Sequence, residues 1–122
     1  MLEPDDSART WVAQHGGSFS FLIAAHMTFS RVFDDYFEEP ADDSGQLLRT
    51  AGRRLTDAAD VLDGAPPVPD ADAQRLLSGI LDRVRRTVAL APDTSHSVEV
   101  VQLKTRTDAD LVLLAERLRA VA

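Results

Sequence analysis

The sequence of 122 residues contains no cysteine. This absence excludes disulfides, cysteine-ligated zinc, iron–sulfur clusters and thiol nucleophiles. A long hydrophobic run is also missing, because polar residues interrupt the longest apolar stretch, Phe19 to Phe29, which is too short to span a bilayer. The N-terminus is acidic where a signal peptide would be basic. We therefore predict a cytoplasmic protein with no membrane partner.

Positive charge is scarce. Lysine and arginine number 13 against 20 acidic residues, which gives a net charge of −7. The densest basic cluster, formed by Arg83, Arg85 and Arg86, adjoins Asp82 and has no aromatic residues among it. Nucleic-acid binding needs clustered positive charge and is helped by stacking side chains. Binding through these arginines is therefore the weakest of our functional hypotheses, and we expect no nucleic-acid partner.

Aromatic side chains are absent beyond Phe37. All seven lie between Trp11 and Phe37, in the first third of the chain. Aromatic residues contribute much of the energy of cores and of interfaces. The segment is therefore either a bulky helix buried against three others, or a helix that presents an aromatic face to a partner, a second copy or an apolar ligand. Residue spacing alone does not separate these alternatives.

Catalytic and metal-binding motifs are also missing. The sequence has no nucleophile elbow, glycine-rich phosphate loop or dinucleotide fingerprint. Asp34, Asp35 and Glu38 have the spacing of an aspartate-rich metal–diphosphate motif, but no second metal-binding motif accompanies them. His96 and Glu99 are three residues apart, yet the Glu-x-x-His pairs of di-iron bundles do not occur. We predict no metal and no cofactor, identify no catalytic residues, and favour a non-catalytic protein over an enzyme.

Proline and glycine divide the chain into segments with helical apolar spacing. Gly16 and Gly17 predict a break after a short first helix, Pro40 ends the second helix, and Gly64 ends the third. Ser18 and Asp70 are candidate N-caps. The expected helices span residues 6–14, 18–38, 44–63, 71–90 and 94–121.

The last segment permits two interpretations. Residues 97–103 are rich in β-branched side chains and could form a strand. However, Val100, Leu111 and Leu118 belong to one apolar stripe that continues to Val121 at helical spacing. We favour one long helix with an irregularity near residues 105–107.

Four amphipathic helices with short connectors bury their apolar faces most simply as an antiparallel bundle. We therefore predict an all-α, four-helix-bundle-like single domain over residues 1–122. The short extra helix at the N-terminus would pack across one end of the bundle. Formation of a dimer is a further way for so small a chain to complete its core.

The leading functional hypothesis is a non-catalytic helical interaction module, such as a small accessory, adaptor or regulatory subunit. Its partner would be another protein or a second copy. The residues predicted for this interaction surface are Trp11, Phe19, Phe21, Asp34, Asp35, Phe37 and Glu38. The alternative is a small-molecule binder or small bundle enzyme, with a pocket between helices. The residues predicted to line that pocket are His26, Phe29, Phe33 and Tyr36.

Overall fold

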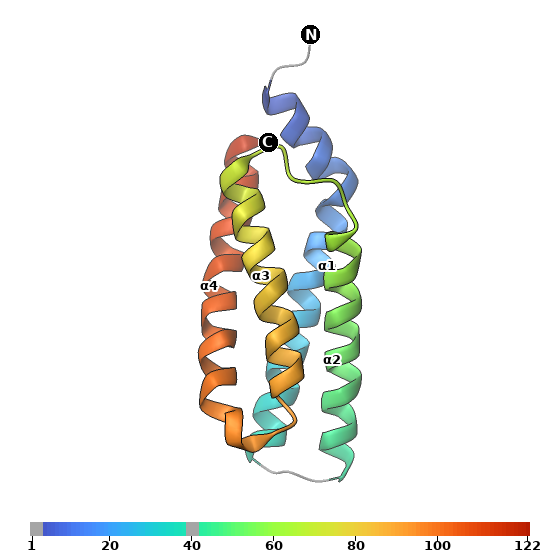
Figure 1. The fold of residues 1–122 in the computed structure, drawn as a ribbon. Helices are drawn as coiled ribbons and strands as arrows, with labels where there is room; N and C mark the ends of the chain where they lie inside the picture. The colour runs from blue at the N-terminus through green and yellow to red at the C-terminus, as the bar shows by residue number, and fades with distance from the viewer. Residues whose placement is uncertain (1–3, 39–41) are drawn as a thin grey trace.

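The computed structural model describes residues 4–38 and 42–122. In this part of the chain four long α-helices run antiparallel to their neighbours and pack as a bundle, with α1 beginning and α4 ending at the same end (Figure 1). The helices are α1 (Pro4–Glu38), α2 (Asp42–Asp63), α3 (Ala71–Leu90) and α4 (Ser97–Val121), with a 3₁₀ turn, η1 (Thr94–His96), before α4. The all-α bundle predicted from the sequence is thereby confirmed. None of the helices in the described ranges is long and apolar enough to cross a membrane.

The prediction of an extra N-terminal helix was wrong. Helix α1 is continuous over 35 residues and passes through Gly16 and Gly17, neither of which has a positive φ. Ser18 therefore lies inside the helix and caps nothing. The physical reason is burial: Trp11 packs in the core and its indole N–H donates to the carbonyl of Pro66 at 2.8 Å. Keeping this bulky residue in the apolar stripe outweighs the cost of about 1 kcal/mol for each helical glycine.

The helix boundaries around the α2–α3 connection follow the sequence signals closely. The Asp70 carboxylate accepts the backbone N–H of Ala73 at 3.0 Å, which confirms the predicted N-cap of α3. Helix α2 ends at Asp63, and Gly64 donates its N–H to the Asp60 carbonyl at 3.0 Å. Gly64 follows the helix as predicted, but without the left-handed conformation of many terminal glycines. The predicted stop at Pro40 lies outside the described residues.

Helix α4 settles the ambiguity of residues 97–103, which are helical and form no strand. Burial favours the helical conformation, because Val100, Leu111 and Leu118 all face the core when the segment is helical. Thr107 is buried too, and its hydroxyl donates to the carbonyl of Leu103 at 2.8 Å, which satisfies the polar group within the helix. The helix consequently runs through residues 105–107 without interruption.

The core receives side chains from all four helices. Leu22, Leu55, Ile80 and Leu114, one from each helix, are almost completely buried. Helix α2 approaches α3 closely at Gly52, where a Cβ atom would come within 3.0 Å of Val88. Helix α1 packs mainly against α2, and α3 packs mainly against α4. The pairing of α1 with α4 is looser, and this is the side of the bundle that is hollowed.

Candidate functional site

A groove runs along the boundary between α1 and α4. It consists of two hollows of about 550 Å³ each, and Ile23 and Ala115 line both of them. The first hollow extends from these residues to Asp34, and the second extends to Val12 and Ala122. From Val12 to Asp34 the groove follows α1 for about 33 Å at 1.5 Å per residue. We call this groove, with the side chains on its rims, the α1–α4 seam.

Exposed hydrophobic side chains border the seam and a separate hollow beyond its Asp34 end. Met27 and Val112 border the first hollow, while Phe37, Val98 and Val101 line a third hollow of about 220 Å³ at the C-terminal end of α1. These residues are five of the nine large hydrophobic side chains that are exposed in the described ranges. Scattered exposed hydrophobic residues are normal, but a grouping of them on the α1–α4 side of the bundle is typical of an interaction surface.

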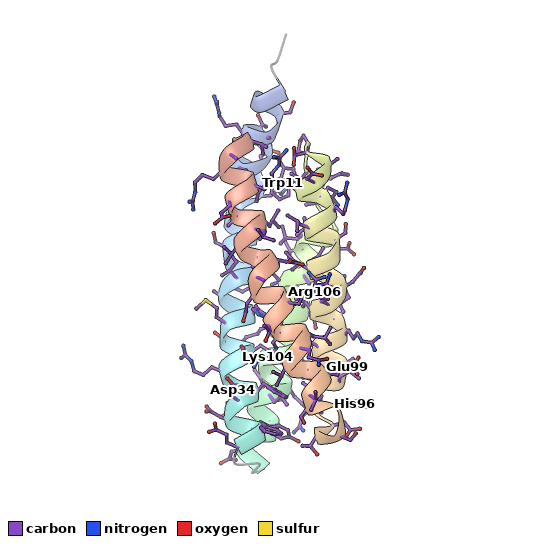
Figure 2. All side chains as sticks on the ribbon, turned by 90° about the vertical axis from the view of Figure 1, so that its left-hand side faces the viewer. Trp11, Asp34, His96, Glu99, Lys104 and Arg106 are labelled. Carbon is purple, nitrogen blue, oxygen red and sulfur yellow. The ribbon has the colours of Figure 1, made fainter. Side chains whose placement is uncertain are left out.

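An ion pair between the buried Lys104 and the exposed Asp34 links α4 to α1 beside the first hollow. The ammonium of Lys104 donates to the Asp34 carboxylate at 2.8 Å and to the carbonyl of Ser30 at 3.3 Å. It also lies 4.8 Å from the centre of the Phe33 ring. Figure 2 shows Lys104 on the side of α4 that faces α1, with Asp34 on the neighbouring helix. A buried ammonium is tolerated because these groups replace its water.

His26 makes the second polar link across the seam. It is buried, and its Nε2 lies 2.7 Å from Oδ1 of the more exposed Asp108. A carboxylate only accepts, so the Nε2–H is the donor. The other ring nitrogen, Nδ1, is buried without a hydrogen-bond partner among the described residues. The geometry is that of a histidine in the core that links two helices and forms one wall of the first hollow.

The basic cluster of α3 is neutralised by acidic residues of its neighbours. Each of its three arginines has a carboxylate partner: Arg83 pairs with Asp110, Arg85 with Asp60, and Arg86 with Glu99. The hydrogen bond to Asp60 raises the pKa of Arg85 above its ordinary value. These pairs leave little free positive charge on this helix.

The residues predicted for the interaction surface do not lie together on one surface in the structure. Trp11 and Phe19 are buried, with 4% and 6% of their surface exposed, and they belong to the core. Phe21 and Phe37 are exposed at 58% and 52% but lie on opposite flanks of α1. Phe21 borders a hollow of about 140 Å³ against α2, whereas Phe37 lies against α4. Asp34, Asp35 and Glu38 are exposed near the end of α1, and Asp34 is the one bound to Lys104.

The four residues predicted to line a ligand pocket do not line one pocket either. Of its four residues only His26 lines the first hollow, because Phe29 and Phe33 are packed in the core. The hydroxyl of Tyr36 donates to the carbonyl of Pro92 at 3.1 Å, beyond the end of α3. Sequence reasoning missed Met27, Val112 and Lys104. One signal was present for Lys104, since it lies at helical spacing between the buried Val100 and Thr107.

Within residues 4–38 and 42–122, no group of three or more histidine, aspartate or glutamate side chains could hold a metal ion. His96 lies 3.8 Å from both Asp93 and Glu99, at the end of the bundle shown by its label in Figure 2. No protein-family model, no curated protein and no solved structure matches the chain significantly. The candidate site therefore depends on the geometry of the α1–α4 seam.

Proposed function

We propose that this chain is a non-catalytic helical interaction module that binds another polypeptide along the α1–α4 seam. The observation that carries the proposal is the continuous groove between Val12 and Asp34, bordered by exposed apolar side chains. Covering these side chains would remove apolar surface from water, which is the main driving force of protein association. The role as a small accessory or regulatory subunit in the cytoplasm is part of this proposal.

The dimensions of the seam favour a helix as the bound element. A groove of about 33 Å accommodates about six turns of an α-helix. Helix-in-groove recognition uses apolar residues on one face of the incoming helix and polar contacts at the rim. The seam offers both, since Ile23, Leu111 and Ala115 line its floor and Arg31, Asp108 and Arg119 lie on its rims.

The pairing of the α3 arginines with acidic residues supports the expectation that nucleic acid is not the partner. A phosphate backbone would have to displace Asp110, Asp60 and Glu99 from these arginines. The excess of acidic residues would also repel it.

Site-specific photo-cross-linking in the producing cells tests the proposal. Benzoyl-phenylalanine replaces Met27 in the seam or, as a control, Val61 on α2; both residues are 59% exposed. We expect a covalent product with a second polypeptide from position 27 and none from position 61. Absence of a product at position 27, or equal products at both positions, would contradict the proposed function.

A second candidate function is the binding of a small apolar ligand in the first hollow. The specific observation is its volume of about 550 Å³ beside His26, which is the size of known ligand sites. Native mass spectrometry of the purified protein should then show a reproducible excess over 13.3 kDa per chain, whether the species is a monomer or a dimer. Ala115 lines both hollows, so Ala115→Trp should fill part of each and abolish the mass excess. Val61→Trp should retain the mass excess. A wild-type mass with no excess over 13.3 kDa per chain would contradict this function.

A further inference from the structure

We propose that the polypeptide covering the α1–α4 seam is a second copy of this chain, docked antiparallel. In this arrangement α1 packs on α1 and α4 packs on α4 across a two-fold axis that crosses the seam near Ile23 and Ala115. Four helices then surround the apolar residues of the two seams, as in a helix bundle. This inference rests on the proposed function and names its partner.

Charges on α4 are self-complementary about this axis. Asp108 and Arg119 lie about three turns apart on the same face of α4, and both line the seam. The midpoint between them falls between Val112 and Ala115. In the antiparallel pair, Asp108 of each copy therefore faces Arg119 of the other. Asp108 accepts a hydrogen bond through Oδ1 alone, and Arg119 is exposed without a partner in the described part of the chain.

The seam-facing residues of α1 are arranged about the same level. Met27 and Gly16 also lie about three turns apart on one helix face, and their midpoint falls between Phe21 and Leu22, less than one turn from Ile23. The exposed Met27 side chain of each copy would enter the notch that Gly16 leaves in the other. Arg9, whose Nε–H donates to the carbonyl of Ala122, and Asp34, which is paired with Lys104, lie farther out on the same face and share this midpoint. The residue pairs of α1 and those of α4 therefore place the two-fold axis at the same level, each without reference to the other.

The single chain gives no reason for glycine at position 16. A glycine inside a helix costs about 0.5–1 kcal/mol relative to alanine. Gly16 has no positive φ, and a Cβ atom there would come no closer than 3.4 Å to Val12, which is ordinary contact. An incoming side chain at the seam does supply a reason, because a Cβ atom would narrow the notch.

The absence of cysteine permits a direct cross-linking test on the full chain. Val112→Cys places one thiol near the proposed axis, and Val61→Cys places one on α2 at matched exposure, 58% against 59%. With a short bismaleimide, purified Val112→Cys should form covalent dimers, while Val61→Cys should remain monomeric. No dimer from Val112→Cys, or equal yields from the two variants, would overturn the second copy as occupant.

A second pair of variants tests the notch without a reagent. Gly16→Leu fills it, whereas Gly17→Leu adds the same side chain at an exposed position where an added Cβ atom would have no neighbour within 4 Å. Sedimentation equilibrium should show a dimer dissociation constant raised about tenfold or more by Gly16→Leu and little changed by Gly17→Leu, since each 1.4 kcal/mol is tenfold in affinity. Equal effects would overturn the proposed axis, and circular dichroism verifies that both variants fold.

The two proposals fail differently. A photo-adduct between position 27 and a different protein, with no Val112→Cys dimer, would overturn the proposal that the partner is a second copy. It would still support the interaction function. An adduct of twice the chain mass, together with the Val112→Cys dimer, supports both. Absence of any adduct at Met27 would contradict both.

Discussion

Lys104 illustrates how a single charged residue shapes the site. Its ammonium is buried between α4 and α1, where Asp34, the Ser30 carbonyl and the Phe33 ring surround it. Removing Asp34 leaves the buried ammonium without its carboxylate partner and is costly. Replacing Lys104 by an apolar side chain of similar volume removes the buried charge itself, and Asp34, whose side chain is 62% exposed, then remains solvated by water.

This difference leads to a prediction for the pair. Asp34→Ala should lower the free energy of unfolding by about 1–3 kcal/mol, because it leaves the Lys104 ammonium short of an acceptor. Lys104→Met should change it by less than about 1 kcal/mol, and Asp34→Ala should cost little in that background. Urea denaturation of the two single variants and the double variant measures these values. Equal losses in the two single variants would contradict the account of Lys104.

The hydrogen bonds of Asp70 make the stability of the folded chain depend on pH. Hydrogen bonds from Arg117 and from the backbone N–H of Ala73 lower its pKa from 3.8 to about 2. Because the pKa is lower in the folded chain, this contribution to stability is present above about pH 4. It is lost as the pH falls towards about 2.

Asparagine at position 70 retains the cap but removes the charge that pairs with Arg117. Asp70→Asn should therefore unfold at lower urea concentration than the wild type at about pH 6, and the difference should vanish near about pH 2. Asp72→Asn, which removes the same charge from the exposed pair with Arg75, is the matched control and should change little at either pH. A deficit of Asp70→Asn that persists at the lower pH would show that the ion pair is not its cause.

At the scale of the helices, α1 departs most from what the sequence predicts. Local propensity places a break at Gly16 and Gly17, but the buried stripe of Trp11, Phe19 and Leu22 holds both halves in one helix. For α2 and α3 the local signals and the packing agree, so the structure begins and ends these helices within two residues of the expectation. The bounds were thus predictable wherever burial did not oppose the local preference.

A continuous α1 predicts that Gly17→Ala is stabilising. Gly17 is exposed, and a Cβ atom added to it would have no neighbour within 4 Å. Alanine should therefore raise the free energy of unfolding by about 0.5–1 kcal/mol. The reverse change at the exposed Ala13, Ala13→Gly, should lower it by a similar amount. Thermal unfolding followed by circular dichroism compares the two. If Gly17→Ala has no effect, α1 does not continue through this position.

At the scale of the whole molecule, the helices could be predicted from the sequence, but the position of the seam could not. Met27, Val98, Val101 and Val112 have the same apolar character as residues of the core, and spacing along one helix does not show which flank a neighbouring helix covers. That depends on how all four helices pack, with α2 close to α3 at Gly52 and α1 farther from α4. His26 was the one predicted pocket residue that this packing places on the hollow.

If a second copy of the chain completes the α1–α4 seam, as we propose, the purified protein is a dimer. Sedimentation equilibrium of the wild type, Met27→Glu and Val61→Glu tests it most directly, since the two variants add the same charge at equally exposed positions. We expect twice 13.3 kDa for the wild type and for Val61→Glu, and 13.3 kDa for Met27→Glu. A wild type of 13.3 kDa at every concentration, or a Met27→Glu variant that remains dimeric, would contradict it.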